Sequence, residues 1–272
     1  MRYPLVCAVA LILNCSTTAG RKQRISVECP ATSRKYIATV ILPEAYQHES
    51  SRRWPVIYLL HGHAKSHTEW PRIAPVKQYA DTYRIIFVSL DGKRNSWYLD
   101  SPVNPESQFS TCFTEAIIPG VDSLFRTHDR AAGRGLIGSS MGGHGAVTLL
   151  AQHPDLFAGA GSIAGIMDLL EFAGKWELPR ILGNPQAHPE RYRQASFVGT
   201  FDRLKGEDKL IILDCGVQDF ALPGNRKAHK LLLEAGIAHE YYERFGDHTP
   251  AYVRHSVESH ILMLSKKMLP VR

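Results

Sequence analysis

The sequence has little of anything that would mark a specialised architecture. Its 272 residues include only 5 cysteines and 16 prolines, and 21% of them are charged. It contains no internal repeat, no low-complexity stretch and no Pro- or Ser-rich linker. These absences exclude collagen-like, coiled-coil and intrinsically disordered chains, whereas the hydrophobic content of 44% is ordinary for a globular protein. We therefore expect a single domain over residues 24–272 with a sizeable core.

Neither sign of charge dominates the chain. It has 32 Lys and Arg against 26 Asp and Glu, which gives a formal net charge of +6. The basic clusters at 21–24 and 265–267 are short and close to the ends, where solvated termini explain them. A nucleic-acid-binding protein concentrates its basic residues on one face, so we expect no nucleic-acid partner.

Long hydrophobic runs are also missing. Beyond the N-terminus no segment approaches the roughly 18 apolar residues of a membrane span, so we expect none. The apolar run 5–13 is too short to cross a bilayer, follows Arg2, and precedes small residues at 17–19 that suit signal peptidase. We predict a signal peptide over residues 1–19 and a secreted or periplasmic protein. Lipidation at Cys15 is the alternative.

Cleavage at that point would leave Cys29, Cys112 and Cys215. Three cysteines allow at most one disulfide, and none of them has the paired spacing of a zinc or redox motif. We interpret them as small, buried, apolar side chains.

Short apolar runs alternate with helical patterns along the chain. The runs are rich in β-branched residues and close at turn signals, as buried strands do; they occupy 36–42, 56–60, 84–90, 135–138, 158–163, 209–213 and 239–244. Apolar residues with helical spacing occupy 70–80, 114–125, 141–152, 225–234 and 251–268. This alternation predicts an α/β fold with a mostly parallel central sheet and helices on both faces.

One stretch breaks the alternation. Residues 165–206 hold aromatic residues and prolines without a clear period. Ligands of parallel sheets bind beyond the carboxyl ends of the strands. We predict that this stretch is an insertion over the rim of an active site.

The sequence G-x-S-x-G at 138–142 places Ser140 between an apolar strand end and the start of a helix. A strand, a sharp turn and a helix in this order project a serine hydroxyl from a sheet edge. The flanking glycines avoid collisions that side chains would cause in so tight a turn. Ser140 is therefore our candidate nucleophile, and a Gly-rich helix start is the alternative.

A serine nucleophile needs a histidine base that a carboxylate holds in place. In such folds the acid follows a late strand and the histidine precedes the last helix. Of the 13 histidines, His248 has that position. We favour Asp219, in the loop after strand 209–213, as the acid. Asp214 is the competing acid, but it ends the strand and its side chain is expected to be held in the sheet.

Two backbone donors are needed to stabilise the oxyanion of the tetrahedral intermediate. Met141 follows the nucleophile and supplies one N–H, and His63, after strand 56–60, is expected to supply the other. The spacing of His61, His63 and His67 could instead chelate a metal. The Asp and further His of a hydrolytic metal site do not follow, so we expect no metal and no cofactor.

Large aromatic side chains near these loops are candidates for the walls of the substrate pocket. We expect four of them to contribute, namely Trp70, Trp97, Tyr98 and Trp176. Flat apolar surface beside a serine suits a sugar ring or an aryl acyl group.

Five blocks of the sequence resemble the putative-esterase family of α/β-hydrolases. They are VIYLLHG (56–62), NSWYLDSP (95–102), GSSMGGHGA (138–146), DCGVQDF (214–220) and GDHT (246–249). This family includes esterase D (S-formylglutathione hydrolase), the feruloyl and acetylxylan esterases of carbohydrate esterase family 1, and the mycolyltransferases. The resemblance covers nearly all of the chain after residue 19 and implies an α/β-hydrolase fold.

The resemblance also implies roles: Ser140 as nucleophile, His248 as base, Asp219 as acid, and Met141 with His63 as the oxyanion hole. It implies a serine carboxylesterase that acts through an acyl-enzyme on short-chain or aryl esters, with acetyl or feruloyl groups on carbohydrate as the expected substrates. The alternatives are a thioesterase like S-formylglutathione hydrolase, an acyltransferase, and a non-catalytic carbohydrate-binding relative. The chain departs from the family at 246–250, where GDHTP replaces the GGHTW of many relatives, so their leaving-group preference does not transfer directly.

Overall fold

The computed structural model of the protein describes residues 21–268. The predicted signal peptide and Cys15 lie outside this range. Within it, no helix is both long enough and apolar enough to cross a membrane.

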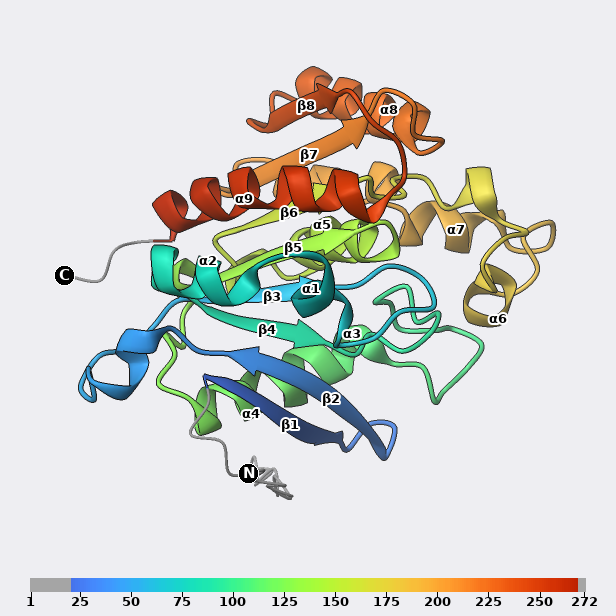
Figure 1. The fold of residues 1–272 in the computed structure, drawn as a ribbon. Coiled ribbons are helices and arrows are strands. Elements are labelled where there is room, and N and C mark those ends of the chain that lie inside the picture. Colours follow the sequence, from blue (N-terminus) through green and yellow to red (C-terminus); the bar gives the residue numbers. More distant parts are fainter. Residues whose placement is uncertain (1–20, 269–272) are drawn as a thin grey trace.

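The centre of the fold is one sheet of eight strands in the order β1-β2-β4-β3-β5-β6-β7-β8 (Figure 1). Their bounds are β1 Lys22–Cys29, β2 Arg34–Ile41, β3 Val56–Leu60, β4 Ile86–Leu90, β5 Arg134–Ser139, β6 Gly159–Ile163, β7 Leu210–Gly216 and β8 Glu240–Arg244. The first two strands pair antiparallel to their neighbours, and all other pairs are parallel. Strands β3 to β6 are buried along their whole length, which explains their continuous apolar runs.

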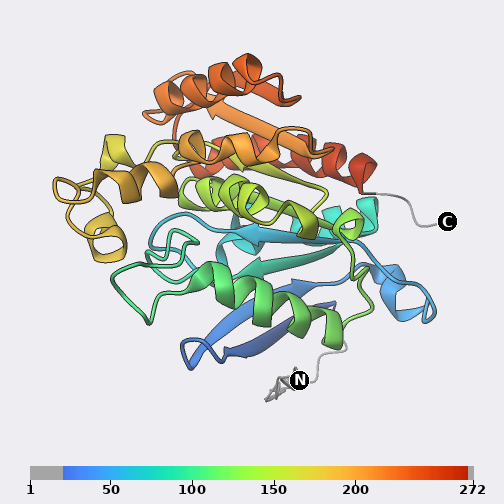
Figure 2. The ribbon, with the colours of Figure 1, turned by 180° about the vertical axis from the view of Figure 1, so that it is seen from behind.

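Helices cover both faces of the sheet, as predicted. One face carries α1 Glu69–Ile73, α2 Val76–Tyr83 and α9 Pro250–Lys267 (Figure 1). The other carries α3 Phe109–Cys112, α4 Ile118–Leu124, α5 Met141–Gln152, α7 Pro189–Ala195 and α8 Leu222–Glu234; Figure 2 shows α4, α5 and α8 from this side. A separate hydrophobic core fills each side of the sheet.

The seven predicted strands are present, but the sequence analysis missed β1. The segment 21–24, interpreted as a solvated end, instead leads into this edge strand, where the side chains of residues 22–24 are exposed and the buried positions begin at Ile25. Basic residues on an edge strand discourage pairing with other chains.

The predicted helix 70–80 is two helices. Pro75 lacks a backbone N–H and precedes α2, so α1 ends at Ile73 and the chain turns before α2 begins. The stretch 165–206 contains α6 Leu178–Leu182 and α7 among short 3₁₀ turns. Figure 1 shows α6 and α7 beside the carboxyl ends of the parallel strands.

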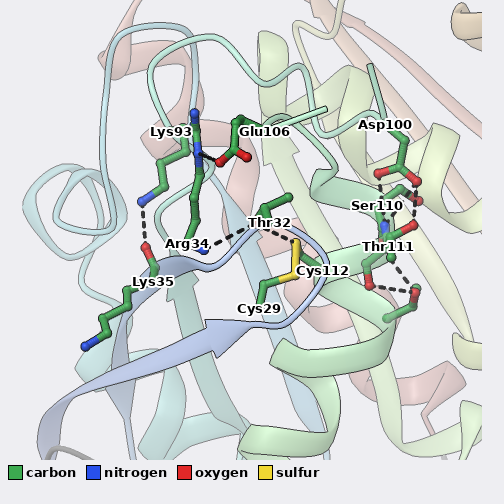
Figure 3. The surroundings of a disulfide bond; sticks show 11 residues. Cys29, Thr32, Arg34, Lys35, Lys93, Asp100, Glu106, Ser110, Thr111 and Cys112 are labelled. Atoms are coloured by element: carbon green, nitrogen blue, oxygen red, sulfur yellow. Dashed lines mark hydrogen bonds and ion pairs between the residues drawn. A yellow bond between two sulfur atoms is a disulfide. The ribbon is translucent and has the colours of Figure 1, made fainter. Parts of the chain in front are cut away.

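A disulfide joins Cys29 at the end of β1 to Cys112 at the end of α3 (Figure 3). The two Cα atoms are 5.4 Å apart although the residues are separated by 83 positions. The interpretation of these two cysteines as unpaired apolar side chains is therefore wrong, because the hairpin that carries Cys29 was not recognised. Cys215 is buried, as expected, and forms no disulfide with another cysteine of residues 21–268.

Removal of this cross-link is expected to lower the free energy of unfolding by about 2–4 kcal/mol, because the bond restricts a long loop of the unfolded chain. Urea unfolding of wild type and Cys29→Ser, with and without dithiothreitol, measures the effect. The difference between them should disappear when the wild type is reduced. Equal stability under oxidising conditions would show that the bond contributes nothing.

Candidate active site

Ser140 occupies a sharp turn between β5 and α5. Its φ of 57° and ψ of −119° lie in a region that residues other than glycine rarely adopt. The turn leaves no room for side chains at the flanking glycines: a Cβ on Gly138 would lie 1.9 Å from the carbonyl oxygen of Gly142, and one on Gly142 would lie 2.1 Å from that of Leu60. The predicted reason for both glycines is thus confirmed.

The loops after β7 and β8 bring the predicted acid and base to this serine. His248 Nε2 lies 2.8 Å from Ser140 Oγ, and His248 Nδ1 lies 2.8 and 3.0 Å from the two carboxylate oxygens of Asp219. The backbone N–H of Gln218 donates to the carbonyl oxygen of Gly246 at 2.9 Å and ties the two loops together. Because the carboxylate can only accept, Nδ1 carries the proton and Nε2 is free to accept the serine proton.

Asp219 and Asp214 have different surroundings. Asp219 is 5% exposed, and its Oδ1 also accepts the backbone N–H of Ala221 at 2.8 Å. Asp214 is fully buried in the sheet, where it contacts Arg244 at 3.1 Å and His260 at 3.3 Å. The structure thus joins Asp219 to His248 and leaves Asp214 in a separate buried cluster.

The loop after β3 lies against the nucleophile. A Cβ on Gly62 would be 3.4 Å from Ser140 Cβ. The N–H of His63 has no hydrogen-bond acceptor in the described part of the chain. Met141 is the first residue of α5, where an N–H has no partner inside the helix. Within residues 21–268 neither predicted donor has an acceptor; His63 lines the same cavity as Ser140, and Met141 directly follows Ser140.

Buried contacts hold this loop in shape. His61 Nδ1 donates to the carbonyl oxygen of Gly62 at 2.7 Å, and its Nε2 accepts the N–H of Gly92 at 2.9 Å. The hydroxyl of Tyr98 donates to the carbonyl oxygen of His61 at 2.9 Å. With both ring nitrogens occupied, His61 orients the loop and has no lone pair left for a metal ion.

The predicted insertion contacts the loops after β3 and β4 through Glu177. Glu177 Oε2 lies 3.6 Å from His63 Nε2 and 3.2 Å from Arg94 Nε. Burial and the nearby Arg94 guanidinium lower the pKa of His63 below its usual value. This lowering favours the neutral form of the His63 side chain, although the Glu177 carboxylate acts in the opposite direction.

A cavity of about 290 Å³ opens beside Ser140 and His248. Trp97 and Trp176 line it, as predicted, with their ring centroids 6.0 Å apart. Trp70 and Tyr98 do not, so that expectation is wrong for both. Trp70 is fully buried in the core beneath α1. The ring of Tyr98 fills the space that Gly92 and Gly145 leave open.

Several residues of the cavity have strained backbone conformations. Trp97, Ser140, Ala164 and Trp176 all line it and have φ of 53°, 57°, 51° and 50°. Non-glycine residues in this region are sparse and cluster at functional sites, where the surrounding structure holds them. The strain supports a site whose walls are set before a ligand binds.

Sequence reasoning missed Phe220, which follows Asp219. Its ring centroid is 4.5 Å from that of His248 and 5.7 Å from that of Trp176, and the residue is 46% exposed. With Trp97 it completes an aromatic wall beside the catalytic candidates. Its position directly after the acid was the available signal.

Comparison with known proteins identifies the family. A model of the family described as Putative esterase matches residues 29–259. The chain belongs to this esterase family. It is 28% identical to an esterase of Mycobacterium tuberculosis over 77% of this chain and 51% of that protein. It is 27% identical to an acetyl esterase of Caldicellulosiruptor saccharolyticus over 73% of this chain and 78% of that protein.

The fold is the α/β-hydrolase fold that the resemblance implied. A solved ferulic acid esterase superposes with a TM-score of 0.77 at 21% sequence identity, over 91% of this chain and 99% of that chain. The chain spans about half the length of the mycobacterial relative.

Proposed function

We propose that this member of the esterase family is a serine carboxylesterase that forms an acyl-enzyme intermediate. One observation carries the proposal: Ser140, His248 and Asp219 form a continuous hydrogen-bonded chain beside a cavity. The free N–H groups of His63 and Met141 supply the oxyanion hole.

In the first half-reaction Ser140 Oγ attacks the ester carbonyl carbon while its proton passes to His248 Nε2. The carbonyl electron pair moves to the oxygen, which the N–H groups of His63 and Met141 stabilise. The bond to the alcohol oxygen then breaks, and this oxygen takes the proton from His248. Water repeats the sequence on the acyl-enzyme and releases the carboxylic acid and free Ser140. Asp219 keeps His248 in the required tautomer and stabilises its protonated form.

The substrates that fit best are short-chain or aryl acyl esters, in particular acetyl or feruloyl groups on carbohydrate. The cavity of about 290 Å³ holds a small acyl group, and its aromatic wall offers a stacking surface for a planar or sugar ring. The similarity to an acetyl esterase supports the same choice.

The kcat/KM for p-nitrophenyl esters is expected to fall about tenfold or more once the acyl chain exceeds about eight carbons, because the cavity that residues 21–268 form has a volume of only about 290 Å³. A panel from acetate to palmitate, with acetylated xylan oligomers and S-formylglutathione alongside, measures this. A preference for palmitate would indicate a lipase, and a preference for the glutathione thioester would exclude the carbohydrate substrates. Acyl transfer to an added alcohol would identify an acyltransferase.

We propose that the protein works outside the cytoplasm, secreted or periplasmic. The predicted signal peptide motivates this, and the disulfide between Cys29 and Cys112 supports it independently, because such bonds persist in oxidising compartments.

A further inference from the structure

A carboxylate lies in the wall of the catalytic cavity, away from the aromatic side. Glu69, the first residue of α1, is 8% exposed and lines the cavity. Its Oε2 accepts a hydrogen bond from Arg72 at 2.8 Å, and the Arg72 side chain is 63% exposed. Its Oε1 has no hydrogen-bond partner in the part of the chain that the structure describes, and this atom keeps some accessible surface. One acceptor oxygen therefore remains open for a ligand.

The surroundings of Glu69 Oε1 make it energetically unfavourable for this oxygen to lose its contact with water. The neighbouring lining residues Ile73, Pro250 and Val253 are apolar and donate nothing to a carboxylate. A buried carboxylate oxygen that loses its water needs a replacement donor. A substrate that fills the cavity must supply that donor.

The chemistry of the donor follows from the charge of Glu69. A carboxylate oxygen only accepts hydrogen bonds, so the substrate group that meets it must donate one. In an ester of a carbohydrate or of a phenolic acid, the ester oxygens only accept, whereas the hydroxyls donate. The open oxygen of Glu69 therefore matches a substrate hydroxyl.

We infer that Glu69 accepts a hydrogen bond from a hydroxyl of the bound ester and selects hydroxylated substrates. The inference rests on the proposed esterase function and adds a polar subsite to it. The hydroxyl comes either from a sugar ring on the alcohol side of the ester or from a phenol on its acyl side. Both sources present the same group to Glu69.

Matched pairs of esters distinguish the two sources. On the alcohol side, methyl 2-O-acetyl-β-D-xylopyranoside is compared with cyclohexyl acetate, a six-membered ring without hydroxyls. On the acyl side, methyl ferulate is compared with methyl 3,4-dimethoxycinnamate, whose phenol is blocked. The readout is the ratio of kcat/KM for the hydroxylated ester to that for its partner. Loss of general activity cancels in this ratio.

Glu69→Leu is expected to lower this ratio about 10- to 100-fold in one pair, because the charged acceptor is lost. Glu69→Gln keeps the shape and one acceptor oxygen, so it should lower the same ratio by less and serves if the leucine variant does not fold. Lys230→Gln is the control. Like Glu69 and Arg72, Lys230 forms an ion pair along one helix, with Glu234 on α8, but neither residue lines the cavity. The ratio should therefore stay at its wild-type value in this variant.

A fall in the xyloside pair assigns Glu69 to a sugar hydroxyl, and a fall in the ferulate pair assigns it to a phenol. Unchanged ratios in both pairs for both Glu69 variants would overturn the inference, as would an equal fall in Lys230→Gln. Neither result would contradict the proposed esterase function. That proposal would be contradicted by a different result, namely a wild-type protein that does not hydrolyse p-nitrophenyl acetate.

Discussion

Ser140→Ala is expected to lower the turnover of p-nitrophenyl acetate on the order of 10⁴-fold or more, because it removes the hydroxyl that contacts the base His248 and forms the acyl-enzyme. Ser140 Oγ lies 2.8 Å from His248 Nε2, its proposed base. The substitution removes one hydroxyl and keeps the backbone of the turn. The variant should therefore fold with wild-type circular dichroism.

A fluorophosphonate reagent provides a second readout for this prediction. It should add one phosphonyl group to the wild type, on the peptide that contains Ser140, and none to Ser140→Ala. Turnover near the wild-type level in a folded variant would exclude the serine mechanism. Treatment with EDTA tests the metal alternative at His61, His63 and His67, since activity that EDTA abolishes and zinc restores would contradict our assignment.

The catalytic candidates could be predicted from the sequence because each depends on local order along the chain. A nucleophile turn, an acid after a late strand and a histidine before the last helix are set by the connections of a parallel sheet. The structure then places His248 within hydrogen-bond distance of both Ser140 and Asp219.

The walls of the cavity could not be predicted in the same way, because neighbouring side chains point in different directions. Glu69 and Trp70 are adjacent on α1, where successive residues turn by about 100° around the axis. Glu69 lines the cavity and Trp70 enters the core. The sequence shows which aromatic residues lie close to the catalytic loops along the chain. Which of their side chains face the cavity depends on how each helix packs, and this could not be predicted from the sequence.

The missed disulfide has a different cause. Cys29 and Cys112 meet only because β1 pairs with β2 at the edge of the sheet, and a basic, half-exposed edge strand carries a weak hydrophobic pattern. Without that strand nothing in the sequence brings these two residues together.

The cluster around Asp214 explains why this acid is structural. Burial opposes its ionisation, but contacts with His260, Tyr252 and Arg244 lower the pKa of Asp214 below its usual value. A carboxylate with a lowered pKa stabilises the fold above the pKa of its unfolded form, and this contribution is lost as the pH falls through the folded value. Asp214→Asn is therefore expected to lower the free energy of unfolding by about 3 kcal/mol at pH 7, with a smaller deficit in acid.

Asp219→Asn should have the opposite profile, with a loss on the order of 10²- to 10⁴-fold in kcat and little loss of stability. An amide in place of the carboxylate can donate to His248 Nδ1, which favours the tautomer with the proton on Nε2. That nitrogen can then no longer accept the proton of Ser140 Oγ, 2.8 Å away. Measuring kcat per folded molecule together with urea unfolding for Asp219→Asn and Asp214→Asn separates the two roles. The opposite result would contradict our assignment. If Asp214→Asn lost turnover while it remained folded, and Asp219→Asn kept its turnover, Asp214 would be the residue that orients His248.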